Sequence, residues 1–326
     1  MDRRRFVLVS LASALAAPFD SEAQQSGKHH RIGVLIGASE SFVSPYIEMF
    51  RQELGRRGYR EGENTAIDYR YAGGNYERLP LLARDLVKFK PDVIVTEGTP
   101  PTRAATAATR TIPIVMTVTG DPVLAGLVSN LTRPGGNLTG ASFFISELAV
   151  KRLQLLREVI PALSHLTVVW NPNNRVHGPI VKAIEQAAKP LSIVVEQITI
   201  RGPGEVDDAL SALSQRQGGL LAIEDGMINV SSRAIAHTAT KYRLPTVFGL
   251  TVFAEAGGLM AYGPNRLELW QRAAGFVDKI LNGAKPGELP VEQAVHFDLV
   301  INLKTAKALG LTIPPSLLVR ADQVIE

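Results

Sequence analysis

Polar and aromatic side chains recur at one kind of position in this sequence, the loop that joins the end of a predicted β-strand to the next helix. These candidate ligand-binding residues are Ser39, Ser41, Phe42, Thr99, Asp121, Asn171, Asp225 and Phe248. Hydroxyls and free N–H groups at helix N-termini favour an anion such as a carboxylate. An aspartate can pair with an ammonium group, and aromatic rings can pack on an apolar side chain. The set therefore suits a small zwitterion such as an amino acid.

Each of these residues also has an ordinary structural explanation. Ser and Thr are common helix N-caps. An aspartate before proline, as at Asp121, is a common turn, and an aromatic residue at a strand end, such as Trp170, can belong to the core. The interpretation as a binding site therefore depends on the group as a whole.

Motifs for catalysis or metal binding are absent from the sequence. It contains no H-E-x-x-H motif, no Walker A loop and no complete nucleophile elbow. The chain has no cysteine, and its six histidines lack metal-ligand spacing. We expect His177 and His237 at the surface. The protein is expected not to be an enzyme and to bind no metal and no cofactor.

The first half of the chain alternates short apolar runs with amphipathic stretches. The predicted strands are Ile32–Ile36, Ile67–Tyr71, Val93–Thr96 and Ile114–Val118, and the predicted helices are Pro45–Arg57 and Arg78–Lys88. Strands that alternate with helices of this length are typical of parallel βαβ units. Carboxyl ends of such strands lie at one edge of the sheet, which is where ligands bind.

The same pattern returns in the second half. Strands are predicted at Leu166–Trp170, Ile193–Ile198, Leu220–Ile223 and Thr246–Phe248, with helices at Ile180–Leu191, Val206–Leu213 and Arg233–Tyr242. In both halves an acidic strand end, 92–98 or 219–226, leads through a helix to a strand that starts with proline, at Pro113 or Pro245. We therefore expect two similar lobes.

The C-terminal part continues neither lobe simply. It holds a predicted strand at Leu259–Tyr262, a helix at Arg266–Leu281, a strand at Phe297–Ile301 and a helix at Leu303–Leu309. The fold class predicted is α/β, with two Rossmann-like lobes whose parallel sheets are joined by a hinge of crossing segments. Residues 31–141 plus 263–294 form the first lobe, and 142–262 plus 295–326 form the second. Hinge candidates are 141–145, 261–264 and 295–297.

The N-terminus has the pattern of an export signal. Arg3, Arg4 and Arg5 precede a short apolar stretch and a small-residue site that ends at Ala23. We expect a signal peptide over 1–23, a flexible leader over 24–30 and a periplasmic protein. The arginines resemble a twin-arginine signal, although Asp2 stands where Ser or Thr is usual, so both that route and general secretion stay open.

Composition excludes some classes of partner. Charged residues make up 20% of the 326, and the formal net charge of +4 is spread along the chain without a long basic run. This distribution argues against nucleic-acid binding. We expect a soluble monomer.

Nine segments, which follow one another in the expected order along the chain, resemble the ABC transporter substrate-binding proteins of the tryptophan/tyrosine-binding type. The segments are 53–64, 78–80, 111–115, 120–123, 133–140, 170–172, 255–263, 289–293 and 301–307. The resemblance implies a type I periplasmic-binding-protein fold and delivery of a ligand, such as an aromatic amino acid, to an ABC permease of the inner membrane. The sequence departs from the common pattern at 224–230 and 248–251.

Two other functions remain open at this point. A ligand-sensing receptor or regulator could use the same fold, although a signal peptide stands where a DNA-binding module would be. A secreted α/β enzyme could hide a pair of catalytic carboxylates.

Overall fold

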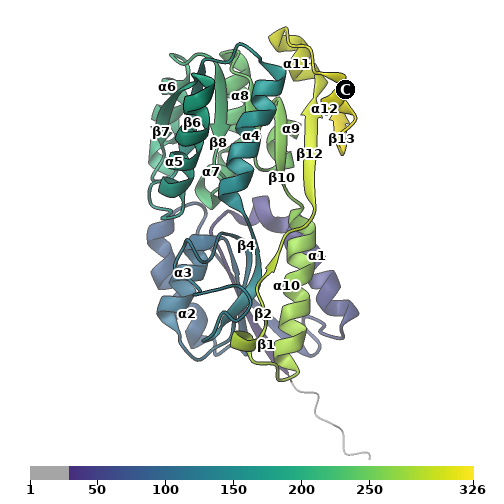
Figure 1. Cartoon of the computed structure of the whole chain (residues 1–326). Coiled ribbons are helices and arrows are strands. Elements are labelled where there is room, and N and C mark those ends of the chain that lie inside the picture. Colours follow the sequence, from purple (N-terminus) through teal and green to yellow (C-terminus); the bar gives the residue numbers. More distant parts are fainter. Residues whose placement is uncertain (1–28) are drawn as a thin grey trace, which may run out of the picture.

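The protein has two α/β lobes, stacked one above the other in the view of Figure 1. The computed structural model describes residues 29–326, so the predicted signal peptide and most of the leader lie outside the described residues. No helix within 29–326 combines the length and apolar character needed to cross a bilayer. The first strand begins at His30, one residue before the predicted start of the first lobe.

The first lobe is built on a sheet of six strands. They are β1 (His30–Ile36), β2 (Thr65–Tyr71), β3 (Val93–Glu97), β4 (Ile114–Gly120), β5 (Leu138–Phe143) and the short β11 (Glu292–Gln293). Four helices cover it: α1 (Glu40–Arg56), α2 (Leu79–Lys88), α3 (Thr99–Ala108) and α10 (Arg266–Leu281). The pair α1 and α10 packs together, as does the pair α2 and α3. Strands β3 to β5 are buried along their whole length, as parallel strands covered on both faces should be.

The second lobe is built on a sheet of seven strands. They are β6 (His165–Trp170), β7 (Val194–Thr199), β8 (Gly219–Ala222), β9 (Thr246–Phe248), β10 (Met260–Pro264), β12 (Phe297–Asn302) and β13 (Gln323–Ile325). Its helices are α4 (Ile145–Val159), α5 (His177–Ala188), α6 (Val206–Leu213), α7 (Gly226–Val230), α8 (Ser232–Lys241), α9 (Thr251–Glu255), α11 (Leu303–Leu309) and α12 (Pro315–Leu318). One-turn 3-10 helices lie at Tyr76–Arg78, Lys189–Leu191, Pro203–Glu205 and Pro286–Glu288.

The two sheets repeat one strand order. In the first it runs β2-β1-β3-β4-β5, and in the second β7-β6-β8-β9-β10, all parallel. The fold class and the predicted internal repeat are confirmed, because β3 and β4 correspond to β8 and β9. Strand β12 then joins β10 in antiparallel direction.

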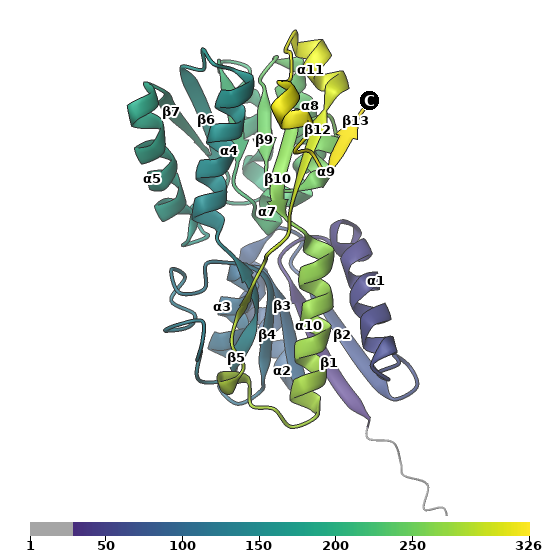
Figure 2. The same ribbon diagram turned by 45° about the vertical axis from the view of Figure 1, so that its right-hand side comes forward.

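Three segments cross between the lobes, and helices follow two of them. After β5 the chain passes into α4, which packs on the second lobe against α5 and β9. After β10 it passes into α10, which packs on the first lobe against α1 and β4. Residues 294–296 make the third crossing, between β11 and β12 (Figure 2). Each lobe therefore carries a helix that follows the other lobe's fifth strand.

Two elements near the first crossing are not predicted from the sequence. Strand β5 contains Gly140, whose φ of +133° is rare for other residues, and its register against β4 shifts between Met116 and Thr119. A glycine and a shift in register both interrupt the two-residue alternation of side chains by which a strand is recognised in a sequence. The helix α4 that follows is amphipathic, but it begins inside the segment we interpreted as a hinge.

Replacing Gly140 with alanine should destabilise the first lobe strongly. A Cβ atom there would lie 2.0 Å from the carbonyl oxygen of Met116, in addition to the unfavourable φ. We expect the free energy of unfolding to fall by more than about 2 kcal/mol in urea titrations. The control is Gly55→Ala in α1, where no atom lies within 4 Å of the added Cβ and which should be neutral or stabilising by up to about 1 kcal/mol. Equal effects of the two substitutions would contradict this account of β5.

Candidate functional site

The carboxyl ends of the central strands of both sheets meet at the boundary between the lobes, around a small internal cavity. The first lobe lines it with Tyr76, Glu97, Thr99 and Arg266 among others, and the second with Asn174, Glu224, Asp225 and Asn229. The cavity has a volume of about 30 Å³, enough for about two water molecules. The lobes are therefore closed on each other at this point, and the space between them holds little more than water.

Small residues let the two lobes touch through their backbones. A Cβ atom on Gly226 would lie 2.9 Å from the carbonyl carbon of Gly37. A Cβ atom on Gly74 would lie 3.1 Å from the Cα atom of Met227. Any larger residue at Gly226 or Gly74 would push the lobes apart, so these glycines permit the closed arrangement.

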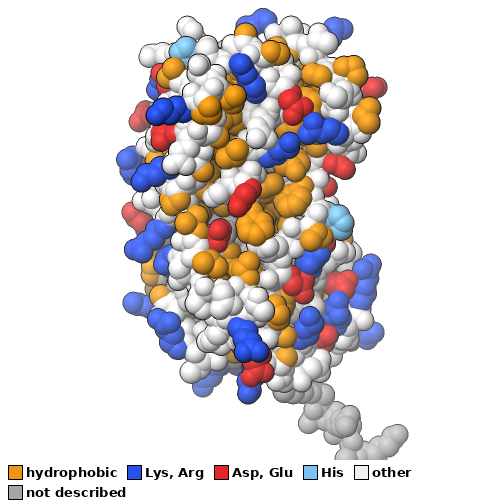
Figure 3. Space-filling view, in the orientation of Figure 1, with side chains coloured by type: hydrophobic (Ala, Val, Ile, Leu, Met, Phe, Trp, Pro, Cys, Tyr) orange, Lys and Arg blue, Asp and Glu red, His pale blue; other side chains and the backbone are white. Residues whose placement is uncertain are grey.

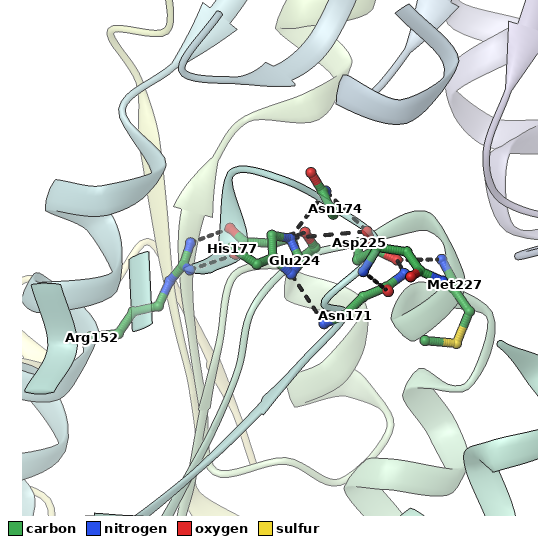
Figure 4. Close-up of polar contacts among 8 residues, drawn as sticks. Arg152, Asn171, Asn174, His177, Glu224, Asp225 and Met227 are labelled. Carbon is green, nitrogen blue, oxygen red and sulfur yellow. Dashed lines mark hydrogen bonds and ion pairs between the residues drawn. The ribbon is translucent and has the colours of Figure 1, made fainter. Parts of the chain in front are cut away.

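The carboxylate of Asp225 lies at the centre of the cavity wall and accepts hydrogen bonds from neutral groups. The side-chain amides of Asn171 and Asn174 each donate at 3.1 Å, and the N–H of Met227 donates at 3.0 Å (Figure 4). Tyr76, from the first lobe, adds its hydroxyl, and burial together with Asp225 raises the pKa of that phenol well above its ordinary value. Asp225 is 4% exposed. Within residues 29–326, no lysine or arginine forms an ion pair with it.

His177 supports this arrangement from behind. Its Nδ1 atom accepts the N–H of Asn171 at 3.2 Å, so its Nε2 atom carries the hydrogen and donates to the carbonyl of Glu224. The side chain is fully buried, and burial lowers the pKa of the imidazole. The surface position predicted for His177 is therefore wrong, because the ring fixes two loops of the site. His237 is exposed, as predicted.

A buried ion pair joins the cavity wall to two crossing segments. Arg152 on α4 donates to both carboxylate oxygens of Glu224, at 2.6 Å for the Nη1–Oε2 contact, and its Nε donates to the carbonyl of Tyr262. The two side chains are 0% and 7% exposed. Figure 4 shows the Arg152 guanidinium aligned with the Glu224 carboxylate. The pair therefore holds α4 and β10 to the loop that presents Asp225.

The first lobe holds an equivalent pair on its own side. Arg266, the first residue of α10, donates to Glu97 at the end of β3 at 2.5 Å, and both side chains are 4% exposed. Burial raises the pKa of Glu97, while Arg266 acts in the opposite direction. The guanidinium also lies over the rings of Phe42 and Tyr46, at 5.3 and 4.7 Å from their centroids, which is the geometry of a cation–π contact.

Within residues 29–326, three buried polar atoms on cavity-lining residues lack a hydrogen-bond partner. They are Oδ1 of Asn174, Oδ1 of Asn229 and Nε of Arg266. Buried groups of this kind are costly unless something binds them. Two are acceptors on the second lobe, and one is a cationic donor on the first. The cavity-lining residues of the second lobe therefore carry unpartnered acceptors, and those of the first lobe carry an unpartnered donor.

Two wider pockets adjoin this cavity. One of about 630 Å³ meets it at Asn229, Leu250 and Arg266 and extends along α1 to Ser39, Ser41 and Phe42. The other, of about 400 Å³, lies over α2 and α3 and shares Tyr76 and Thr99 with the cavity.

The structure brings most of the predicted site residues to this region. Thr99 and Asp225 line the inner cavity, Asn171 lies directly behind Asp225, and Ser39, Ser41 and Phe42 line the 630 Å³ pocket. Two residues lie elsewhere. Asp121 accepts the N–H groups of the turn that follows it, and Phe248 is fully buried against Phe253. Neither lines the cavity or the two adjoining pockets.

Sequence reasoning missed Tyr76, Glu97, Asn174, Asn229 and the two buried arginines as parts of the site. Glu97 and Glu224 had a signal, since each is a charged residue at the end of an apolar strand at matching places in the internal repeat. Arg152 and Arg266 had none, because an arginine on an amphipathic helix is usually exposed.

Comparisons with known proteins agree on one family. The family model described as ABC transporter substrate binding protein matches residues 39–325. A curated relative, the tyrosine-binding protein of Clostridioides difficile (strain R20291), is 30% identical over 281 residues, covering 85% of this chain and 81% of its own.

Two solved structures differ in how well they superpose. The ABC domain from Streptococcus pneumonia in complex with L-Trp is 25% identical and matches with a TM-score of 0.85 over 91% of this chain and 100% of that one. The ligand-free, open structure of a substrate binding protein with adhesive properties from Clostridium difficile is 28% identical, with a TM-score of 0.64 over 91% and 99%. Since identity is similar in the two, the poorer match to the open structure agrees with closed lobes here.

Removing one partner of the Arg152–Glu224 pair should cost more than removing both charges. Arg152→Met leaves Glu224 buried without a counter-charge, and we expect a loss of about 3–5 kcal/mol in the free energy of unfolding. The double variant Arg152→Met, Glu224→Gln should be more stable than Arg152→Met alone in urea titrations. If the double variant loses as much free energy of unfolding as the two single variants together, Arg152 and Glu224 contribute independently, which would contradict their description as an ion pair.

The buried His177 should make stability depend on pH. The unfolded imidazole binds a proton near pH 6.5, whereas the lowered pKa keeps the folded ring neutral to lower pH. The stabilisation that neutral His177 gives the folded state is therefore complete above pH 6.5. As the pH falls below that value, the free energy of unfolding decreases by up to about 1.4 kcal/mol per pH unit. Urea titrations at pH 7.5 and 5.5 should show a smaller pH effect in His177→Gln than in the exposed control His237→Gln. Equal pH effects in the two variants would refute a neutral His177.

Proposed function

Because this chain belongs to the ABC transporter substrate-binding protein family, we propose that it captures an amino acid between its lobes and delivers it to an ABC permease. The supporting observation is the charge pattern of the cavity. Glu97 and Glu224 each have an arginine partner, whereas the buried Asp225 has only neutral donors. A buried carboxylate without a counter-charge favours a cationic ligand group.

The unpartnered atoms indicate how such a ligand would lie. Its ammonium group would face the second lobe, where the Asp225 carboxylate and the Oδ1 atoms of Asn174 and Asn229 accept hydrogen bonds. Its carboxylate would face the first lobe, where Arg266 has a free Nε–H and α3 begins at Thr99. The N-terminus of a helix adds favourable potential for an anion.

The side chain of the ligand would extend toward the 630 Å³ pocket. Phe42, Tyr46 and Leu250 give that pocket an apolar wall next to the cavity. An aromatic amino acid would use this wall, and the relatives named above for tyrosine and bound to L-Trp support that class.

Closure would be coupled to binding because the site is divided between the lobes. A ligand that contacts both lobes favours the closed form by its difference in affinity for the two forms. The crossing segments at 143–145, 264–266 and 294–296 would act as the hinge. In the closed form the Tyr76 hydroxyl occupies part of the space beside Asp225, so the ligand ammonium would have to displace it.

The place of action would be outside the cytoplasm. The predicted signal peptide would export the chain to the periplasm, where a closed, ligand-loaded form would meet the permease. A permease that distinguishes the closed from the open protein would have to contact the exposed surfaces of both lobes.

An amino acid screen tests this proposal directly. The melting temperature of the purified protein should rise with one or a few of the proteinogenic amino acids at millimolar concentration, because a ligand that binds only the folded state stabilises it. Asp225→Asn should abolish the rise, since it removes the charge that pairs with the ammonium group. The matched control Asp121→Asn, outside the cavity, should retain it. No shift with any amino acid, or an undiminished shift in Asp225→Asn, would contradict the proposal.

A further inference from the structure

The 400 Å³ pocket at the edge of the cleft has features that the amino acid proposal does not use. It lies over the N-terminal part of α2 and along α3, and the loop before α5 borders it from the second lobe. Figure 1 shows α2, α3 and α5 on the left side of the molecule, whereas α10 and β12, which adjoin two of the crossings, lie to the right. The groove therefore has a wall from each lobe, and the two walls face each other only while the lobes are closed.

Two arginines from opposite lobes line this groove. Arg103 extends from the middle of α3, and Arg175 lies in the loop before α5. Burial and the neighbouring Arg175 lower the pKa of Arg103 below its ordinary value. Closure thus brings two like charges together. Water screens part of their repulsion, because Arg175 is exposed, and an anion between them would relieve the rest.

The protein itself supplies little compensation for these charges. In the part of the chain from 29 to 326, neither guanidinium has a carboxylate within ion-pair distance. Arg103 donates to the carbonyl oxygen of Ala125, which neutralises no charge. Glu77 also lines the groove, but it pairs with neither arginine. Figure 3 shows Lys and Arg side chains, with some Asp and Glu among them, along the left edge of both lobes.

The floor between the arginines is apolar. Leu79, Pro80, Pro100, Ala104 and Ala107 form it, all from the first lobe. Apolar walls with a few convergent polar groups are typical of small-molecule sites, and the volume falls in their range of 300–1,000 Å³. Arginine also binds carboxylates well, because its planar fork matches their geometry.

We propose that this groove is a second binding site, which takes a small organic carboxylate with an apolar body between Arg103 and Arg175. Its carboxylate would compensate both guanidiniums, and its apolar body would cover the floor over α2 and α3. Because the site needs both lobes, its ligand would favour the closed form and so strengthen capture in the central cavity. By reciprocity, a ligand in the central cavity would strengthen binding in the groove.

Benzoate titration of the purified full chain by calorimetry tests the second site. We expect saturable binding at a one-to-one ratio. Arg175→Gln should weaken it at least tenfold, since this exposed residue can change without disturbing the core. Lys189→Gln, which removes the same charge at the far end of α5, should leave it unchanged. Chloride and inorganic phosphate at equal ionic strength should bind more weakly than benzoate, because they cannot use the apolar floor.

Competition with amino acids separates this site from the central cavity. Benzoate binding should persist in the presence of a saturating mixture of amino acids, because the mixture would fill the central cavity and leave the groove open. Displacement of benzoate by the mixture would place benzoate in the central cavity and overturn the proposal. Absence of saturable binding, an unchanged affinity in Arg175→Gln, or equal binding of phosphate and benzoate would overturn it as well.

Discussion

One buried charge governs the interface between the lobes. Asp225 is buried at the boundary, yet its hydrogen-bond donors are two amides, a backbone N–H and a phenol. The other buried carboxylates of the region, Glu97 and Glu224, each have an arginine. Burying the Asp225 carboxylate away from water without a counter-charge costs free energy. A cationic ligand group would therefore relieve that cost.

The rest of the architecture brings that charge to the right place. Two sheets with the same strand order present their carboxyl ends to each other, and the helices α4 and α10 exchange lobes after the fifth strands. Arg152 and Arg266, which neutralise the flanking carboxylates, lie on these two exchanged helices. The segments that would bend during closure therefore also hold the cavity walls in position.

Much of the fold could be predicted from the sequence, because its strands are apolar runs and its helices have clear faces. The helix Arg266–Leu281 and the repeat of β3–β4 by β8–β9 are confirmed. Strand β5 could not be predicted because Gly140 and the irregular register break its pattern. In the site, Asp225 follows from its place after a strand. The buried arginines and His177 could not be predicted, since their burial depends on tertiary contacts with Glu224 and Glu97 that lie far away in sequence.

The most direct test of ligand-coupled closure is the distance between the lobes in solution. The chain has no cysteine, so spin labels at Arg84→Cys in the first lobe and Lys182→Cys in the second would be the sole labelled sites. Pulsed electron resonance should show a broad or long-distance distribution without ligand, and a single shorter distance with a saturating mixture of amino acids. A distribution that stays the same with and without the mixture would contradict the claim that a ligand closes the two lobes.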